Sequence, residues 1–243
     1  MIPGCAVEIR GCTTHSEFND CVGLQRAVWH FADLDIVTTD LLLLAAKTGG
    51  QVLGAFERGR MLGFAFSVPA LREKVVYLHS HMLAVLPEYQ NQGIGLQLKL
   101  AQRDEALSRD IRLIEWTFDP LEIRNAYFNI VRLGAIVRRY EPDLYGITSS
   151  PLHRGIPTDR LFAEWWLDSA RVKQVLVGSP QNDKRNRPIT VPEPKPNNAL
   201  EIQAKLRSEF KESFAAGFVV TGFERGKSGG TYWLEQEGVG ICD

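Results

Sequence analysis

Two histidines on one predicted strand are the side chains best suited to proton transfer in this chain. His79 and His81 lie in an apolar run at 75–86, and alternate residues of a strand share a face. We therefore expect both imidazoles to point the same way as Leu83 and Val85. Imidazole titrates near neutral pH, so the pair suits a proton relay with His79 as the first candidate base. The alternative is a pair of structural histidines in a polar cleft or a hydrogen-bond network.

A glycine-containing turn after this strand predicts an anion site. Gln90-Asn91-Gln92-Gly93-Ile94-Gly95 leads into a helix that we expect over about 93–109, with Leu96 in its first turn. Glycine has no Cβ, so a ligand can approach the backbone closely. The first N–H groups of a helix lack internal partners, and the helix dipole favours negative charge there. The turn therefore suits a phosphate or a pyrophosphate, although a G-x-G can also be a tight turn alone.

Composition and charge exclude several classes of protein. The 243 residues include 28 basic and 29 acidic ones, which gives no net electrostatic reason to expect nucleic acid or a membrane surface as partner. Four cysteines show no zinc-like spacing, so we expect no metal. The longest apolar run, 41–46, is too short to span a bilayer, and the N-terminus lacks a signal pattern. We expect a soluble, cytoplasmic protein with reduced thiols.

The periodicity of apolar residues predicts an α/β chain. We expect strands at 7–11, 51–57, 61–68, 75–86, 113–118, 135–140, 161–167, 218–224 and 231–237, and helices at 14–29, 41–47, 93–109, 123–132 and 199–216. Five prolines within 179–198 indicate a linker or an extended surface segment. The chain therefore divides into a main domain at 1–178, a linker at 179–198 and a helix-and-hairpin appendage at 199–243. The appendage is small for an independent core, so we expect it to pack on the main domain or on a second subunit of a homodimer.

This order of elements resembles the GNAT superfamily of N-acetyltransferases over about residues 5–170. The resemblance is carried by Leu83-Ala84-Val85, Pro87, Tyr89, the Q-x-x-G-x-G turn, and Asn125 followed by Leu133-Gly134-Ala135. It implies a mixed, mostly antiparallel central sheet flanked by helices. It also implies an acyl-CoA-dependent N-acyltransferase of the EC 2.3.1 type, with acetyl-CoA as co-substrate. The acceptor would be an amino group of a small molecule or of another, unidentified acceptor.

The resemblance also implies which residues hold the coenzyme. Backbone amides from Gln90 to Leu96 would bind the pyrophosphate. The edge of Leu83-Ala84-Val85, splayed from its neighbour, would pair with the pantetheine amides, and one N–H there would stabilise the oxyanion. Asn125 would contact the coenzyme from the next helix; the alternative for Asn125 is a simple helix cap.

Transfer to an amine needs a base and, for the departing thiolate, an acid. A lysine-type ammonium has a pKa of about 10.4, so it must lose a proton before or during attack. Histone-type members of the family place a glutamate base where His79 stands. The tyrosine that many members use as acid is replaced here by Ile130, which leaves Tyr127 as the candidate acid. Tyr127 could instead be packing, and a thiolate whose pKa is near 8.5 can leave unassisted.

Two other functions stay open on the sequence. A coenzyme-A-binding or regulatory module that has lost turnover would explain the missing tyrosine. A nucleotide- or S-adenosylmethionine-dependent enzyme would use the turn as a G-x-G-x-x-G fingerprint, with Glu115 about twenty residues on. Two features disfavour that fingerprint. Leu98 stands where it has its third glycine, and about eighty residues precede the turn, whereas a dinucleotide-binding domain usually begins with this motif.

Overall fold

The structure is a computed structural model, and it describes residues 7–146, 155–179, 186–193 and 197–238. The chain forms two compact units. Unit 1 is Met1–Ile114 with Ser149–Leu152, and unit 2 is Glu115–Thr148 with His153–Asp243. Each unit is described by itself below. The division at 178 and 198 expected from the sequence stays a prediction.

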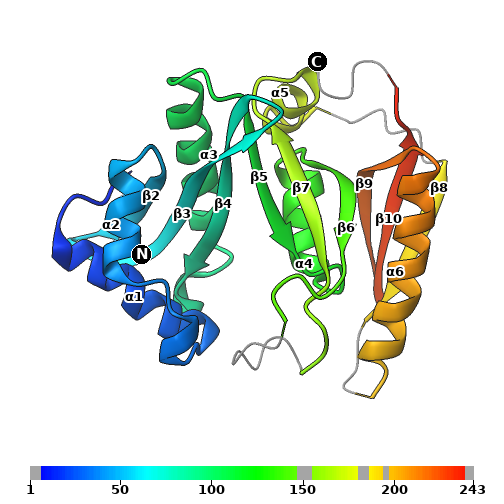
Figure 1. Cartoon of the computed structure of the whole chain (residues 1–243), viewed down its shortest axis with the longest axis horizontal. Coiled ribbons are helices and arrows are strands. Elements are labelled where there is room, and N and C mark those ends of the chain that lie inside the picture. The colour runs from blue at the N-terminus through cyan, green and yellow to red at the C-terminus, as the bar shows by residue number, and fades with distance from the viewer. Residues whose placement is uncertain (1–6, 147–154, 180–185, 194–196, 239–243) are drawn as a thin grey trace, which may run out of the picture. The chain divides into compact units, whose positions relative to one another are not determined.

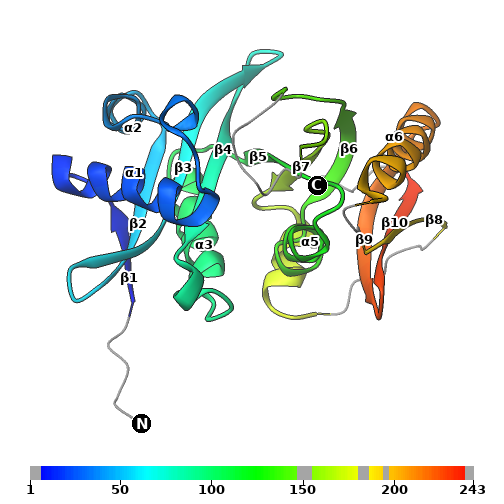
Figure 2. The same ribbon diagram turned by 90° about the horizontal axis from the view of Figure 1, so that it is seen from below.

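The described residues of unit 1 form four antiparallel strands in the order β1-β2-β3-β4. Figure 1 shows β2, β3 and β4, and Figure 2 also shows β1. They are β1 (Glu8–Gly11), β2 (Gln51–Glu57), β3 (Arg60–Arg72) and β4 (Val75–Val85). The strands predicted at 51–57 and 61–68 are confirmed, and they form a hairpin with Glu57 opposite Arg60. Gly59 has a φ of 81° in this turn, a conformation that glycine adopts without steric cost.

Helices cover both faces of this sheet, as Figure 2 shows. On one face lie α1 (His15–Trp29) and α2 (Thr39–Lys47), joined through the short η1 (Asp33–Asp35). Their apolar residues share a core with Phe64, Phe66 and Met82 of the strands. On the other face, α3 (Ile94–Leu107) follows the short η2 (Pro87–Tyr89) and packs through Ile94 and Leu98.

Helix α1 begins where the sequence predicts it, with Thr14 as its N-cap. Thr14 accepts a hydrogen bond from the backbone of Glu17, and the Glu17 carboxylate accepts one from the Thr14 N–H at 3.0 Å. This capping box satisfies donors that the first turn leaves without partners. Thr38 caps α2 in a similar way, by accepting from the Leu41 N–H.

A β-bulge interrupts the pairing of β4 with β3. Ser67 pairs with Ser80, but Phe66 pairs with Met82, so His81 is an extra residue on β4. A bulge of this kind sets two consecutive residues of one strand opposite one residue of its partner. The alternation of faces along β4 therefore changes at His81.

In unit 2, the residues that the structure describes form six strands in the order β5-β7-β6-β9-β10-β8. Its elements are β5 (Leu113–Phe118), α4 (Ile123–Ala126), the π-helical η3 (Tyr127–Arg132), β6 (Ile136–Glu141), β7 (Arg160–Trp166), α5 (Ala170–Leu176), β8 (Arg187–Pro192), α6 (Ala199–Ala215), β9 (Phe218–Gly226) and β10 (Gly229–Gln236). The predicted helix at 123–132 thus forms, and its second half is π-helical. The sequence analysis did not anticipate α5.

Part of the proline-rich segment expected as a linker is a strand. In β8, Ile189 and Val191 are buried while Pro188 and Pro192 are exposed, which is the alternation of a half-buried strand. The strand pairs with β10 on one side and ends the sheet order. Proline lacks an N–H donor and is tolerated on such an edge strand. The prolines therefore mark a sheet edge here.

The C-terminal helix and hairpin extend the sheet of unit 2. Val137 of β6 pairs with Val220 of β9, and β9 pairs with β10 over most of its length. From α6, Phe210 stacks on Tyr140 at 5.7 Å between ring centroids and meets Tyr232 edge-on at 5.2 Å. Such aromatic pairs add about 1 kcal/mol beyond burial of their area.

The predicted fold class is confirmed. The chain has a mixed α/β arrangement with helices flanking a mostly antiparallel sheet, as the GNAT resemblance implies. Within the described residues, no helix is long and apolar enough to cross a membrane.

Candidate active site

The glycine turn has the geometry of an open helix N-terminus. Gly93 is the N-cap of α3 with a φ of 86°, and Asn91 also has a positive φ, at 61°. A Cβ added to Gly93 would meet no atom within 4 Å. Among the described residues, no side chain caps this helix, and its first turn contains no acidic residue. The free N–H groups and the helix dipole therefore face space that an anion can enter.

Side chains around the turn hold its backbone in place. The Gln90 amide donates to the Val85 carbonyl at 3.0 Å, and the Gln92 amide donates to the Glu88 carbonyl at 3.0 Å. Below the turn, Ile94 is 3% exposed and belongs to the core on the α3 side. The turn is thus fixed from within, while Gln90, Asn91, Gln92 and Gly93 are exposed.

The three residues expected to pair with pantetheine lie at the end of β4. Leu83 and Val85 contact the core on the α3 side, and Ala84 belongs to the core on the side of α1 and α2. On the β3 side, Ala84 is in register with Phe64. Their role toward a coenzyme stays a prediction.

The structure brings His79 and His81 together, but not on the expected face. Their ring centroids are 6.4 Å apart, and His81 meets Phe66 edge-on at 5.9 Å. Phe66 belongs to the core on the α1 and α2 side, whereas Leu83 packs on the α3 side. The expectation that the imidazoles share a face with Leu83 and Val85 is therefore wrong. The bulge at His81 changes the alternation that the expectation assumed.

The surroundings of His81 favour its neutral form. Burial among neighbouring atoms, and then the adjacent His79, lower the pKa of His81 below 6.5. The imidazole edge still reaches solvent, since His81 is exposed. A neutral imidazole with an accessible edge is able to accept a proton near neutral pH.

Asn125 and Tyr127 lie in unit 2, apart in sequence from the turn and strand of unit 1. Asn125 is exposed on α4, and Tyr127 begins the π-helical stretch. The Arg225 guanidinium lies 4.0 Å from the centroid of the Tyr127 ring, a cation–π arrangement. Tyr127 is thus packed against a cation, and its role as an acid stays a prediction.

Hydrogen bonds from side chains and from the backbone hold the Leu-Gly-Ala segment. The Trp165 indole donates to the Leu133 carbonyl at 2.7 Å, Arg171 donates to the Gly134 carbonyl at 3.0 Å, and the Ala135 N–H donates to Asn129. Gly134 has a φ of 78°, and a Cβ there would come within 3.2 Å of Val175. The glycine is required by both backbone conformation and packing.

The sequence analysis missed a buried polar cluster between α3 and β4. Lys99 is 1% exposed, and its Nζ donates to Ser80 Oγ at 2.9 Å and to Gln102 Oε1 at 3.2 Å. Burial lowers the pKa of Lys99 to about 7. The signal was present, because Lys99 and Gln102 fall on the same helical stripe as Leu98 and Ala106.

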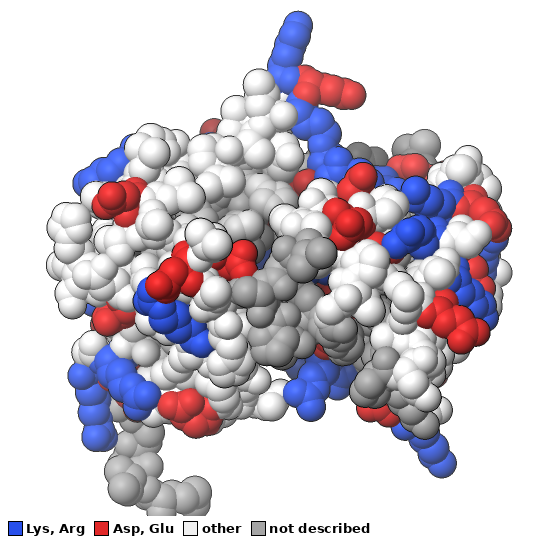
Figure 3. All heavy atoms as spheres, turned by 60° about the horizontal axis from the view of Figure 1, so that its bottom comes forward, with Lys and Arg blue, Asp and Glu red and all other residues white. Residues whose placement is uncertain are grey.

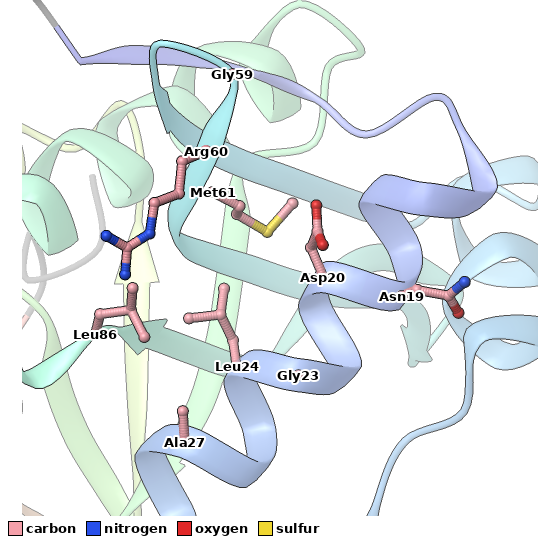
Figure 4. Close-up of a pocket in the computed structure, with 9 residues that line it drawn as sticks. All are labelled: Asn19, Asp20, Gly23, Leu24, Ala27, Gly59, Arg60, Met61 and Leu86. Carbon is pink, nitrogen blue, oxygen red and sulfur yellow. The ribbon is translucent and has the colours of Figure 1, made fainter.

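A pocket of about 400 Å³ lies on the α1 side of unit 1 (Figure 4). One wall comes from α1 and another from the β2–β3 turn, with Leu86 beside them. Its lining residues are Asn19, Asp20, Gly23, Leu24, Ala27, Gly59, Arg60, Met61 and Leu86. None of the residues singled out from the sequence lines it.

Charges are mixed on the face shown in Figure 3, with basic and acidic side chains interspersed. Over the residues that the structure covers, no group of three or more His, Cys, Asp or Glu is arranged to hold a metal ion.

Comparison with known proteins gives one family and a set of related folds. Residues 15–128 match the model of the Acetyltransferase (GNAT) family. The ribosomal-protein-S18-alanine N-acetyltransferase from Escherichia coli is 15% identical, with a TM-score of 0.54 over 68% of this chain and 96% of that one. An N-acetyltransferase from Staphylococcus aureus Mu50 is 16% identical, with a TM-score of 0.53 over 67% of this chain and 98% of that one. These likenesses establish the fold, and the comparison with curated proteins gave no match.

Proposed function

We propose that the chain is an N-acyltransferase that uses acetyl-CoA as co-substrate. The match of residues 15–128 to the model of the Acetyltransferase (GNAT) family supports this proposal. The acceptor is the amino group of a small molecule or of another molecule. We further propose that the protein is cytoplasmic and uses no metal.

The observation that carries the proposal is the open N-terminus of α3. Gly93 leaves the cap without a side chain, and the first turn has no acidic residue to compete with a phosphate. A pyrophosphate placed there would accept hydrogen bonds from backbone N–H groups and interact favourably with the dipole. The side-chain amide of Gln90 already donates to the Val85 carbonyl. The hydrogen bonds to the pyrophosphate would therefore come from backbone N–H groups of the turn.

The reaction consists of one acyl transfer. The amine nitrogen attacks the thioester carbonyl, a tetrahedral intermediate forms, and the C–S bond breaks as the C–O double bond returns. The amide product keeps the acetyl group, the amine loses one proton, and coenzyme A leaves as a thiolate that takes up one proton. A backbone N–H of 83–85 would stabilise the oxyanion; removing such a donor typically costs about 3 kcal/mol.

His79 and His81 are the proposed groups that take the proton from the amine. Their ring centroids are 6.4 Å apart. The lowered pKa of His81 favours the neutral imidazole, which is the form that can act as a base. A general base contributes about 10²- to 10⁴-fold to a rate. Asn125 and Tyr127 are proposed as a coenzyme contact and as the acid, respectively.

A thermal-shift screen tests the co-substrate directly. A ligand that binds only the folded state raises the unfolding temperature, and the shift grows with the ratio of the ligand concentration to its Kd. Acetyl-CoA and longer acyl-CoAs are expected to raise it, and NAD and S-adenosylmethionine are not. The reverse pattern would contradict the proposal and favour a nucleotide- or S-adenosylmethionine-dependent enzyme.

A turnover assay separates the enzyme from a binding module. Thiol release from acetyl-CoA is followed with a panel of primary amines, including aliphatic diamines, amino acids and peptides with free N-termini. Release that depends on one amine identifies the acceptor class. Tight acetyl-CoA binding without release across the panel would favour a regulatory module instead.

A homodimer through residues 199–243 remains part of the proposal. Within the chain, this segment already buries Leu206, Phe210 and Tyr232. A dimer would therefore use the outer surface of the segment, and sedimentation equilibrium of the full chain measures its mass.

A further inference from the structure

The buried cluster around Lys99 joins α3 to the strand pair that flanks the bulge. Lys99 donates to Ser80, and Ser80 donates to Gln102 Oε1 at 3.2 Å. Ser80 is 5% exposed and Gln102 is fully buried. Because buried polar groups are costly without partners, these three side chains constrain one another.

The same cluster also includes Gln51 of β2 and Ser67 of β3. Gln51 donates to the Gln102 carbonyl at 2.9 Å and accepts from Ser67 Oγ at 3.0 Å. Ser67 of β3 is the residue paired with Ser80, immediately before the bulge. Ser67 and Ser80, the last pair before the bulge, are thus both hydrogen-bonded to the cluster through their side chains. Gln51 also donates to Glu105, which binds Arg109 at 2.7 Å.

The position of the bulge decides which face the histidines occupy. With the bulge at His81, Ser80 faces α3 while His81 and Met82 face α1 and α2. Shifting the strand register by one residue would turn Ser80 into the apolar core and His79 toward α3. That shift would leave Lys99 without its hydroxyl partner in a buried site, which is strongly unfavourable.

We propose that Lys99 is a positioning residue: through Ser80 it holds the bulge of β4 in the register that presents His79 and His81 on the face opposite α3. Its catalytic meaning rests on the proposed function, because the two histidines are candidate bases there. The placement of the imidazoles is independent of that function. Lys99 itself is 1% exposed and contacts protein groups, so it acts through Ser80.

Histidine NMR of the full chain tests the placement without any acceptor. The Cε1–H signals of His79 and His81 are assigned with the His79→Gln and His81→Gln variants and followed against pH. Lys99→Met replaces the side chain with an unbranched one that is a single atom shorter and has no amino group. We expect it to move both signals and to raise the pKa of His81, because a relaxed bulge separates this ring from Phe66 and from His79. The signals of His15 and His30 should keep their wild-type positions.

Three further variants make the outcome decisive. Ser80→Ala removes only the hydroxyl that Lys99 holds, and it should shift the same two signals even if Lys99→Met fails to fold. The double variant should match the single ones, since residues that act through each other are non-additive. Lys47→Met, at an exposed lysine of α2, should change neither signal.

The results separate this inference from the proposed function. Unchanged titration of His79 and His81 in both Lys99→Met and Ser80→Ala would overturn the positioning role. Calorimetry with acetyl-CoA on the wild-type protein tests the proposed function separately from these variants. Wild-type protein that fails to bind acetyl-CoA would refute the function alone, and the NMR result would still stand.

Discussion

Arg207 of α6 binds Asp159 with two hydrogen bonds, from Nε at 2.9 Å and from Nη2 at 2.8 Å. Asp159 is fully buried, and it also accepts from the Tyr140 hydroxyl at 2.5 Å. A bidentate contact between a guanidinium and a carboxylate is both strong and directional. The C-terminal helix is therefore joined to β6 and to the start of β7 through one buried carboxylate.

Replacing Arg207 tests how much this contact stabilises unit 2. Arg207→Met leaves the buried Asp159 carboxylate without its cation, and we expect a loss of about 2 to 4 kcal/mol in the free energy of unfolding. Urea denaturation measures it. Arg207→Met combined with Asp159→Asn should recover part of the loss. Equal stability of Arg207→Met and wild type would mean that α6 is held by its apolar face alone.

Gly93→Asp tests the anion site at the turn. The new carboxylate would stand where the pyrophosphate is proposed, and we expect acetyl-CoA affinity to fall at least about 100-fold, or 2.7 kcal/mol. The φ of 86° adds strain of about 1 kcal/mol, while an aspartate at the N-cap favours the helix. Gly59→Asp is the matched control, since Gly59 also has a positive φ and open space around its Cβ. Undiminished binding to Gly93→Asp by calorimetry would rule out this turn as the site.

The histidines can be separated by the pH dependence of turnover. Burial, and then the neighbouring His79, lower the pKa of His81, so the acid limb of kcat/KM should lie at a lower pH than an unperturbed imidazole would give. His79→Gln removes one of the two causes of this shift, and the limb should then move upward. Each substitution is expected to lower kcat by about 10²-fold if that residue carries the base. Full activity of both variants on an identified amine would exclude the pair.

Lys99 makes stability depend on pH in a defined window. Its pKa is about 7 in the folded chain and about 10.5 in the unfolded chain, so between these values the unfolded state binds more protons. Stability from this group therefore rises with pH from about 7 to 10.5, by up to about 1.4 kcal/mol per pH unit. Lys99→Met removes that slope. Urea unfolding at pH 7, 8 and 9 measures the free energy of unfolding of both proteins. The difference between Lys99→Met and wild type should favour the variant most at pH 7.

Most of the fold could be predicted from the sequence because the signals are local. Thr14 and Glu17 define the start of α1, and runs of strand-forming residues predicted nine of the ten strands that the described residues form. The strand β8 was missed because its prolines indicate a linker unless the partner strand is known. The pairing of β8 with β10 joins segments far apart in the sequence, so local residue patterns cannot predict it.

The candidate site was predictable at the turn and less so along β4. Gly93 and Gly95 identify the turn by residue type alone. The face of the histidines depends on a bulge, and no residue type at 79–82 signals one. Lys99 could have been noticed on the buried stripe of α3, but its partner Ser80 is nineteen positions away and only the packed structure brings them together.

The extra residue in β4 also affects how this chain should be compared with others. Strands that match β4 residue for residue up to Ser80 fall one position out of phase from Met82 onward, unless they carry the same insertion. An ungapped alignment would then equate core positions with solvent-facing ones across half of the strand. Transfer of a base or a binding role onto this strand is sound only when the two halves are aligned separately.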